Sequence, residues 1–336
     1  MAFRETMELK YQEILKNYIK DQSETALYQG QKFSRKSIEN QVTPEEIISL
    51  HKQLLEDMYP DLPKYVVHSF DILLEVILPY GVAYRENQSL RDQKRELRSE
   101  IEIAANVQQT LLETKVPVVD GLDIGAISVP AKHMNGDYYH FVQDENNSIS
   151  IAIADVIGKG IPAALCMSMI KYAMDSPLEN RPEPSSVLEN LNRVVEQNVD
   201  PSMFISMFYG MYNHDRHIFS YASAGHEPGF FYDGKKDEFQ EIHAKGLLLG
   251  IDKKTKYIQY EKQINQGDMI ILLSDGVTEC RTDEGFIEKE VLMTYIKKYA
   301  DLSSQEIVTN IFKEFERRQN FQLRDDFTLI ILKRDV

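Results

Sequence analysis

The stretch ISIAIADVIGKGIPAA at residues 149–164 decides the fold of this chain. Isoleucine at every second position from 149 to 153 alternates with serine or alanine, which predicts a β-strand whose second face is tightly packed. The strand ends at Asp155, and the glycines and proline that follow predict a turn into a helix that begins at Ala163. An unpaired charge at the edge of a core costs several kcal/mol, so we interpret Asp155 as a metal ligand. The alternative is that Asp155 caps the amino terminus of that helix.

The same stretch also fits a nucleotide-binding pattern, which we reject. Gly158, Gly160 and Ala163 match G-x-G-x-x-A after a strand. That fold requires a helix that returns to a second parallel strand with an acidic tip. Here the chain continues after Met174 through PLENRPEPSS into another helix, so a dinucleotide site is not predicted.

The composition is that of a folded protein without a nucleic-acid partner. A length of 336 residues is enough for two domains. The net charge of −15 and the lack of a concentrated Lys/Arg run disfavour binding to a phosphate backbone. We see no segment that approaches the roughly 18 apolar residues of a membrane span, and no apolar core of a signal sequence. We therefore expect a cytoplasmic protein that binds other proteins or cations and does not associate with a membrane.

The two cysteines, Cys166 and Cys280, do not indicate zinc or thiolate chemistry. Neither begins a C-x-x-C pair. Neither is followed six residues later by an arginine, the spacing that would let a thiolate attack a phosphate held by a guanidinium group. We interpret both as packing residues in a reduced cytoplasm.

Residues 1–84 are predicted to form a helical bundle. Amphipathic helices are expected at 2–20, at 24–40, from residue 43 and from residue 62. The third begins with a capping box around Thr43 and with proline at its first position. His51 on this helix is expected to be a packed histidine at the edge of the core rather than a ligand. A bundle this small gains stability by pairing with a second copy, so we predict a homodimer.

Residues 85–120 are predicted to form a helical linker with the pattern of a short coiled coil. Apolar residues recur at heptad spacing at Leu90, Leu97, Ala104 and Leu111. Lys94 and Gln108 fall at intermediate core positions, which weakens the seam and suits a switchable linker. An equally weighted alternative is one exposed helix that docks on its own protein.

Residues 121–336 are predicted to form an α+β domain. Short alternating strands are interrupted by two pairs of helices, a pattern typical of a layered fold. The predicted helices span 161–175, 184–198, 288–299 and 303–319. The predicted strands are LDIGAISV, YYHFV, ISIAIAD, MFISMFYGMY, HIFSYASAG, GFFYD, YIQYEKQI, MIILLSD and FTLIILKR.

Acidic residues recur at strand ends within this domain. They are Asp137, Asp155, Asp275 and the pair Asp325 and Asp326. Strand ends and strand starts converge at one edge when neighbouring strands run antiparallel. Oxygen ligands without clustered His or Cys favour magnesium, manganese or calcium. We therefore predict a carboxylate metal site.

The motifs NGDYYHF, DVIGKGIPAA, SDGVTE and DDFTLIIL, in this order, resemble those of the metal-dependent PPM (PP2C-type) serine/threonine phosphatases, in their bacterial SpoIIE-like branch. The resemblance covers residues 121–336, and the amino-terminal helices with AANVQQTLL at 104–112 extend it to nearly the whole chain. It implies an αββα sandwich around two divalent cations, Mn²⁺ or Mg²⁺. In this family, attack on phosphorus comes from a metal-activated water, so no side-chain nucleophile is expected.

The resemblance also implies a role for each acidic residue. Asp155 would bridge both metals, with the Val156 carbonyl on one of them. Asp275 and Asp325 would complete one site, and Asp137 would serve the other, largely through water. Asp326 is the alternative to Asp325.

His226, in the motif SAGHEP, stands in a glycine-bounded turn. A general-acid role is conceivable for it, but we favour a structural role.

The function implied by the resemblance is removal of phosphate from a phosphoserine anti-anti-sigma factor. The residues 1–84 would bind a kinase-like activator, and the enzyme would be a positive regulator of the general stress sigma factor. One alternative is a non-catalytic pseudophosphatase that only binds partners, against which the retained acidic cluster argues. Another is a scaffold stabilised by calcium. Turnover of a phosphorylated partner distinguishes all three.

Overall fold

The structure is a computed structural model, and it describes residues 2–131, 134–144, 147–156, 161–175, 183–200, 203–282, 285–321 and 323–335. The chain divides into two compact units, residues 1–98 and 99–336. We describe each unit by itself. The turn predicted at Gly158 and Gly160 lies outside the described residues.

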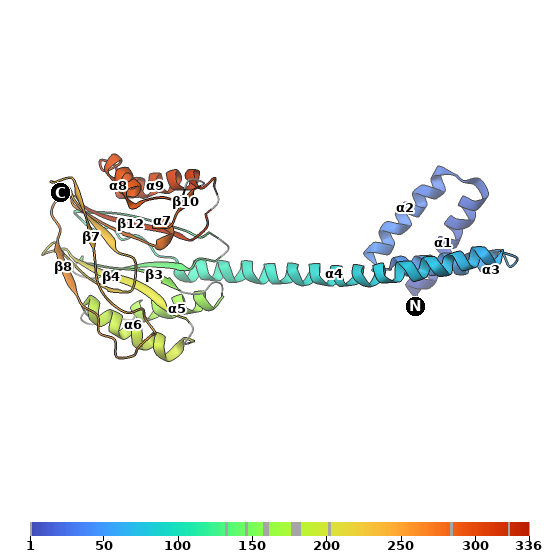
Figure 1. Ribbon diagram of the computed structural model, residues 1–336, viewed down its shortest axis with the longest axis horizontal. Helices are drawn as coiled ribbons and strands as arrows, with labels where there is room; N and C mark the ends of the chain where they lie inside the picture. Colours follow the sequence, from blue (N-terminus) through green and yellow to red (C-terminus); the bar gives the residue numbers. More distant parts are fainter. Residues whose placement is uncertain are drawn as a thin grey trace. The chain divides into compact units, whose positions relative to one another are not determined.

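The first unit is helical, as predicted. It contains α1 (Ala2–Asp21), α2 (Glu24–Glu39), α3 (Pro44–Met58) and the beginning of α4 (Lys64–Leu112) (Figure 1). The predicted capping box is present, because the Thr43 side chain accepts from the Glu46 N–H while the Glu46 carboxylate accepts from the Thr43 N–H. His51 is half-buried, and its Nδ1 lies 3.0 Å from the Tyr11 hydroxyl, which confirms its packing role.

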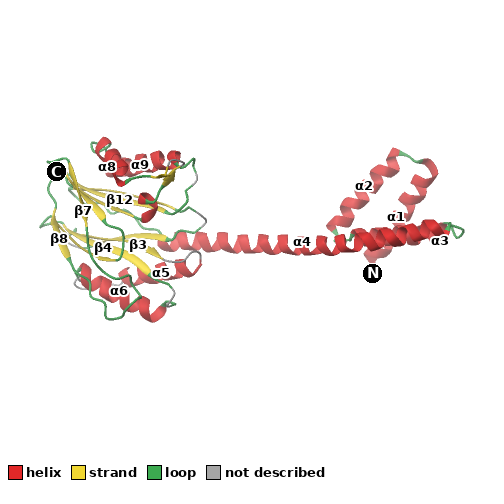
Figure 2. Ribbon diagram, viewed as in Figure 1, coloured by secondary structure: helices red, strands yellow, loops and turns green. Residues whose placement is uncertain are grey.

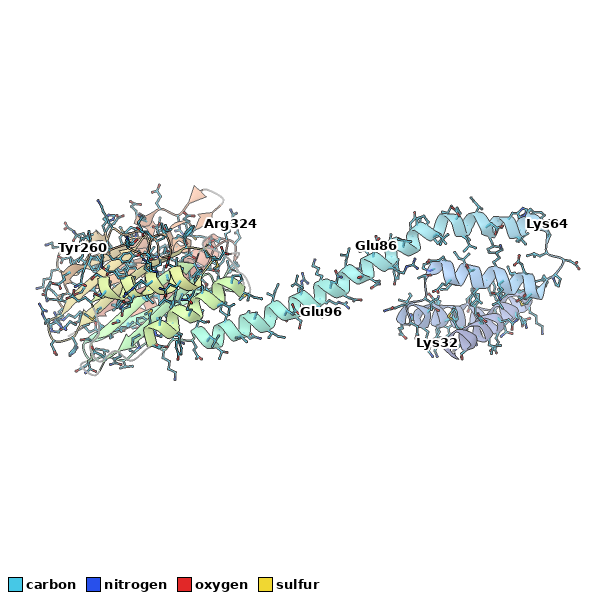
Figure 3. The ribbon with its side chains drawn as sticks, turned by 90° about the horizontal axis from the view of Figure 1, so that it is seen from below. Lys32, Lys64, Glu86, Glu96, Tyr260 and Arg324 are labelled. Carbon is cyan, nitrogen blue, oxygen red and sulfur yellow. The ribbon has the colours of Figure 1, made fainter. Side chains whose placement is uncertain are left out.

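Helix α4 joins two elements that were predicted separately. The fourth helix of the bundle and the helical linker form one helix, which runs through Pro79 without a break. In Figure 3, Lys64 and Glu86 lie on this one helix, on either side of Pro79. A proline inside a helix removes one backbone hydrogen bond.

A part of α4 is more apolar than the sequence analysis expected. One 18-residue window has the length and composition to cross a membrane, so the expectation that no segment approaches a span is wrong for this stretch. Length and composition alone are weak evidence. Asp71 of α4 forms an ion pair with Lys52 of α3 at 2.5 Å.

The second unit contains two five-stranded antiparallel sheets, each covered by a pair of helices (Figure 2). The first sheet has the order β1 (Leu122–Val129), β12 (Phe327–Arg334), β9 (Met269–Leu273), β6 (Gly229–Asp233), β7 (Glu238–Ile242). The second has the order β2 (Asp137–Gln143), β3 (Ile149–Val156), β4 (Ile205–Asn213), β5 (Ile218–Ala224), β8 (Tyr260–Gln263). The covering helices are α8 (Lys289–Lys298) with α9 (Ser304–Arg318), and α5 (Ile161–Asp175) with α6 (Pro184–Asn198). This is the predicted αββα sandwich.

The layers of the domain follow from the alternation of large and small residues at positions 149–154. Ile149, Ile151 and Ile153 of β3 lie in the core between the two sheets. The alternating Ala152 and Ala154 face the other way and pack against α5 and α6. Small residues on that face let the helices approach the sheet closely. The equivalent core on the first sheet is closed by α8 and α9.

Every predicted strand is present, and four small elements among the described residues were not predicted. These are β7, the short pair β10 (Arg281–Thr282) and β11 (Gly285–Phe286), and the single-turn helix α7 (Asp275–Thr278). The rejection of a dinucleotide fold is confirmed, because β3 pairs antiparallel with both of its neighbours.

Cys166 and Cys280 are buried free thiols, as expected, and burial raises the pKa of each to about 11.

Candidate active site

Asp137 and Asp155 lie opposite each other on adjacent strands. The antiparallel register of β2 and β3 pairs them directly, and the register of β3 and β4 places Ser206 on the other side of Asp155. Asp155 lies inside β3, and α5 begins only at Ile161. The connection between Asp155 and this helix, on which the capping alternative depends, lies outside the described residues.

Asp326 is brought to the same edge from the first sheet. Its Oδ1 accepts a hydrogen bond from the Ala131 N–H at 2.7 Å, and its Oδ2 accepts from the Gly136 N–H at 2.5 Å. A Cβ on Gly136 would stand 3.1 Å from Oδ2 of Asp326 and 3.6 Å from Oδ1 of Asp155. Gly136 therefore lies between these two carboxylates, and the missing side chain leaves room there.

Asp275 and Asp325 form the outer part of the acidic cluster. Asp275 begins α7 directly after β9, and Asp325 is exposed just before β12. A side chain on Gly276 would collide with the Asp326 carbonyl, so glycine is required for this approach. Burial raises the pKa of Asp275, and the nearby charges of Asp325 and Glu279 raise it further.

Asp137 is the most deeply buried member of the cluster, at 3% exposure. Burial raises its pKa well above the ordinary range, and the charges of Asp155 and Asp326 add to this. Hydrogen bonds from Ser274 and Thr328 act in the opposite direction. Its Oδ2 has no hydrogen-bond partner among the described residues. A buried carboxylate oxygen with this environment is stabilised by a cation.

The donor set fits hard divalent cations. Five carboxylates lie on strand ends and turns of one edge. Burial first, and neighbouring carboxylates second, raise the pKa of Asp137 and of Asp275, and a bound cation would offset both effects. Within the described ranges, no group of three or more acidic, histidine or cysteine side chains is arranged so that it could hold a metal ion. The main-chain carbonyl of Val156 is a further oxygen donor at the end of β3.

A second layer of polar groups supports the cluster. The Asn135 Oδ1 accepts from the Asp137 N–H at 3.0 Å, and its Nδ2 donates to Ser128 at 2.8 Å. Ser128 in turn lies 2.9 Å from Thr328, whose N–H donates to Ser274 at 3.1 Å. Sequence analysis assigned none of these hydroxyl groups to the site. The available signal was a buried threonine in the otherwise apolar run FTLIIL.

His226 links the two sheets beside the cluster. Its Nε2 donates to the Leu273 carbonyl at 3.2 Å, so its Nδ1 carries no proton and accepts from the Ser206 hydroxyl at 2.8 Å. Burial lowers its pKa to about 4, against the effect of the Leu273 hydrogen bond. Both ring nitrogens are occupied in the neutral form, which supports the structural role over the general-acid role.

A cavity of about 840 Å³ opens beside Asp137. One wall is the last three turns of α4, including Glu102 and Gln108, and the other is formed by Asn135 and Tyr139. All of these residues belong to the second unit. The end of α4 therefore borders the acidic cluster directly.

Comparison with known proteins agrees with this architecture. Residues 145–335 match the family model described as stage II sporulation protein E (SpoIIE), and residues 9–83 match the amino-terminal domain of phosphoserine phosphatase RsbU. Phosphoserine phosphatase RsbU of Bacillus subtilis is 61% identical over all of both chains. The chain belongs to the SpoIIE-type branch of the PPM serine/threonine phosphatases.

Solved structures of PPM-type domains share the fold of this phosphatase. The SiaA PP2C domain of Pseudomonas aeruginosa covers 72% of this chain and 99% of its own, with a TM-score of 0.62 and 18% identity. RsbX in complex with magnesium covers 65% of this chain and 98% of its own, with a TM-score of 0.50 and 17% identity. These likenesses are at the level of the fold.

Proposed function

We propose that this phosphatase removes phosphate from a phosphoserine of an RsbV-like anti-anti-sigma factor, and that it thereby activates the general stress sigma factor. The observation that carries the proposal is the 61% sequence identity with RsbU over the full length of both chains. The similarity includes the amino-terminal domain as well as the phosphatase domain. The cavity beside Asp137 is large enough to admit a phosphorylated segment of a partner protein.

We propose that two ions, Mn²⁺ or Mg²⁺, bind at the acidic cluster. Asp155 with the Val156 carbonyl, Asp275 and Asp325 would hold them, and Asp137 would contribute largely through water. When bound, such ions supply Lewis-acid stabilisation of a phosphoryl group and activation of water. The magnesium in the RsbX structure supports this choice of cation. The unpartnered Oδ2 of Asp137 supports the position.

Between the two adjacent aspartates, we assign the ligand role to Asp325. Both carboxylate oxygens of Asp326 accept main-chain hydrogen bonds, from Ala131 and Gly136. Asp326 thus holds the turn that precedes Asp137, while the Asp325 carboxylate interacts with Asp275 electrostatically. The two residues would act together, one as a ligand and the other as a support.

We propose that the helical unit forms a homodimer and binds a kinase-like, RsbT-like activator. Large apolar side chains lie exposed on one face of α4 at Tyr65, Ile72, Val76 and Tyr80, with exposures of 55% or more. Such a stripe is typical of a helix that packs against a partner. The buried cluster of this unit is small, with Leu15, Leu50 and Leu54 at its centre. A partner would therefore add apolar contacts that the unit lacks.

Without the activator, the enzyme would be nearly inactive and incompletely metallated. Both proteins would act in the cytoplasm. A shift of a two-state equilibrium from 1:99 to 99:1 requires about 5.5 kcal/mol, which one protein interface can supply.

The test is phosphate release from the phosphorylated anti-anti-sigma factor by the full-length protein, in Mn²⁺ or Mg²⁺, with and without the kinase-like protein. We expect release that requires the divalent cation and rises strongly with the activator. Binding of the phosphorylated protein without release would instead indicate a pseudophosphatase.

A further inference from the structure

Gln108 joins the end of α4 to the turn that carries Asp137. Its Nε2 donates to the Asn135 carbonyl at 2.8 Å, and its Oε1 accepts from the Asn135 N–H at 3.1 Å. The side chain is only 4% exposed. A buried primary amide that satisfies both main-chain groups of one residue fixes that residue in position and orientation.

Asn135 has no polar group left over. Gln108 binds its main chain, while its side chain binds the Asp137 N–H and the Ser128 hydroxyl. The connection from α4 to the buried carboxylate therefore passes through one residue. A displacement of Gln108 would leave two half-buried main-chain groups of Asn135 without these partners, and the Asp137 N–H would lose its fixed acceptor.

The last turns of α4 are held on the phosphatase domain by further contacts at their end. The Lys171 ammonium of α5 donates to the Leu111 carbonyl at 2.6 Å and to the Glu113 carbonyl at 3.1 Å. The Thr114 hydroxyl lies 2.9 Å from Nδ1 of His140 on β2. Gln108 Nε2 also lies 3.6 Å from the sulfur of Met167 on α5. The contacts that dock the end of α4 on the phosphatase domain therefore also hold Gln108 in its position.

This placement differs from the heptad pattern of the sequence. The heptads put Gln108 at an intermediate core position of a coiled coil, where it would weaken the seam. In the structure its side chain is buried against the phosphatase domain. The amide at this position forms hydrogen bonds that an apolar seam residue could not form.

We propose that Gln108 is a positioning residue that makes cation binding at Asp137 depend on the docked end of α4. The inference rests on the proposed function in one respect, namely that divalent cations bind at the acidic cluster. It adds a direct route of control, from α4 through Asn135 to Asp137. Helix α5 takes part by holding the end of α4 through Lys171 and Met167.

The test compares Mn²⁺ affinity, measured by isothermal titration calorimetry on the metal-free full-length protein. Gln108→Met keeps the length and helix propensity of the side chain but removes the amide. Gln109→Met makes the same change at the neighbouring exposed residue and serves as the control. We expect about a tenfold weaker Mn²⁺ affinity for Gln108→Met, or about 1.4 kcal/mol, and wild-type affinity for the control.

A double-mutant cycle keeps the test independent of folding defects. Asn135→Ala preserves the main-chain contacts with Gln108 but removes the acceptor of the Asp137 N–H. If both residues act in one chain of contacts, the double variant binds Mn²⁺ about as weakly as Asn135→Ala alone. Additive losses would overturn the proposal, as would equal affinity in the wild type and Gln108→Met. Failure of the wild type to bind Mn²⁺, both alone and with the activator, would overturn the metal centre itself, and this proposal with it.

Discussion

Asp137 and Asp155 are directly paired in the register of β2 and β3. Two carboxylates at paired positions of adjacent strands repel each other, and the repulsion contributes to the raised pKa of Asp137. The fold retains this pair in a core that is otherwise well packed. A cation bound between or beside them, as proposed, would offset this repulsion.

Gly136 provides a first test, because it separates Asp155 from Asp326. We expect Gly136→Ala to weaken Mn²⁺ binding about tenfold, since the added methyl group forces the two carboxylates apart. The measurement is calorimetric titration of metal-free protein. The control is Gly30→Ala in α2, where an added Cβ meets nothing within 4 Å. That change should leave Mn²⁺ binding unaltered and stabilise the helix by about 0.5–1 kcal/mol. Equal Mn²⁺ affinity in both variants would contradict the arrangement.

Asp137 provides a test of pH dependence in the absence of metal. Its folded pKa lies above the ordinary value of 3.8, so its contribution to stability is lost as the pH rises from that value through the folded pKa. Asp137→Asn removes the ionisable group. We measure the free energy of unfolding in urea, with a chelator present, for both proteins at pH 5 and at pH 8. We expect the difference between Asp137→Asn and the wild type to shift in favour of the variant as the pH rises from 5 to 8. The variant should also lose part of the stabilisation by Mn²⁺. A pH-independent difference would show that the burial of this carboxylate is wrongly assigned.

His226 provides a test with the opposite sign. Its folded pKa of about 4 lies below the ordinary 6.5, so the neutral ring stabilises the fold above pH 6.5 and this contribution falls on acidification towards pH 4. The slope is about 1.4 kcal/mol per pH unit. We expect His226→Gln, which can still donate to the Leu273 carbonyl, to be less stable than the wild type at pH 7 and nearer to it at pH 5.

The same variant separates the structural role of His226 from an acid role. A structural His226 predicts that His226→Gln leaves the shape of the pH–rate profile unchanged between pH 6 and 8. Loss of a basic limb from that profile would indicate that the ring donates a proton during turnover.

Val76 provides a test of the apolar face of α4, where its side chain is 55% exposed. We expect Val76→Glu to shift the protein from dimer to monomer in light scattering, because a charge in a helix interface is strongly unfavourable. Tyr28→Glu introduces the same group at an exposed apolar position of α2, away from the stripe on α4, and should remain dimeric. A dimer of unchanged affinity in Val76→Glu would place the interface elsewhere.

The sequence predicted the sandwich well because its strands carry strong patterns. Alternation in β3 and apolar runs in β9 and β12 each specify a strand buried on one or both faces. Strand β7 was missed because its residues, EFQEI, are mostly polar and partly exposed at a sheet edge. The continuity of α4 was missed because Pro79 and Gly81 are typical signals for the end of a helix.

The site was only partly predictable for a physical reason. Asp137, Asp155 and Asp275 stand out because each is a charge next to an apolar strand. The proposed roles of Asp325 and Asp326 depend on which main-chain N–H groups point at each carboxylate, and no spacing encodes this. The sequence left open whether the segment around Gln108 packs in a coiled coil or on its own domain, because a heptad pattern looks the same in both cases.

The most direct test of the metal-dependent phosphatase is Asp155→Asn, which keeps the shape of the side chain and removes its charge. Phosphate release from the phosphorylated anti-anti-sigma factor would be measured at saturating activator in Mn²⁺, with the fold checked by circular dichroism. We predict a loss of about 10³-fold or more with an unchanged spectrum. Release within tenfold of the wild type, with the same Mn²⁺ dependence, would contradict the account.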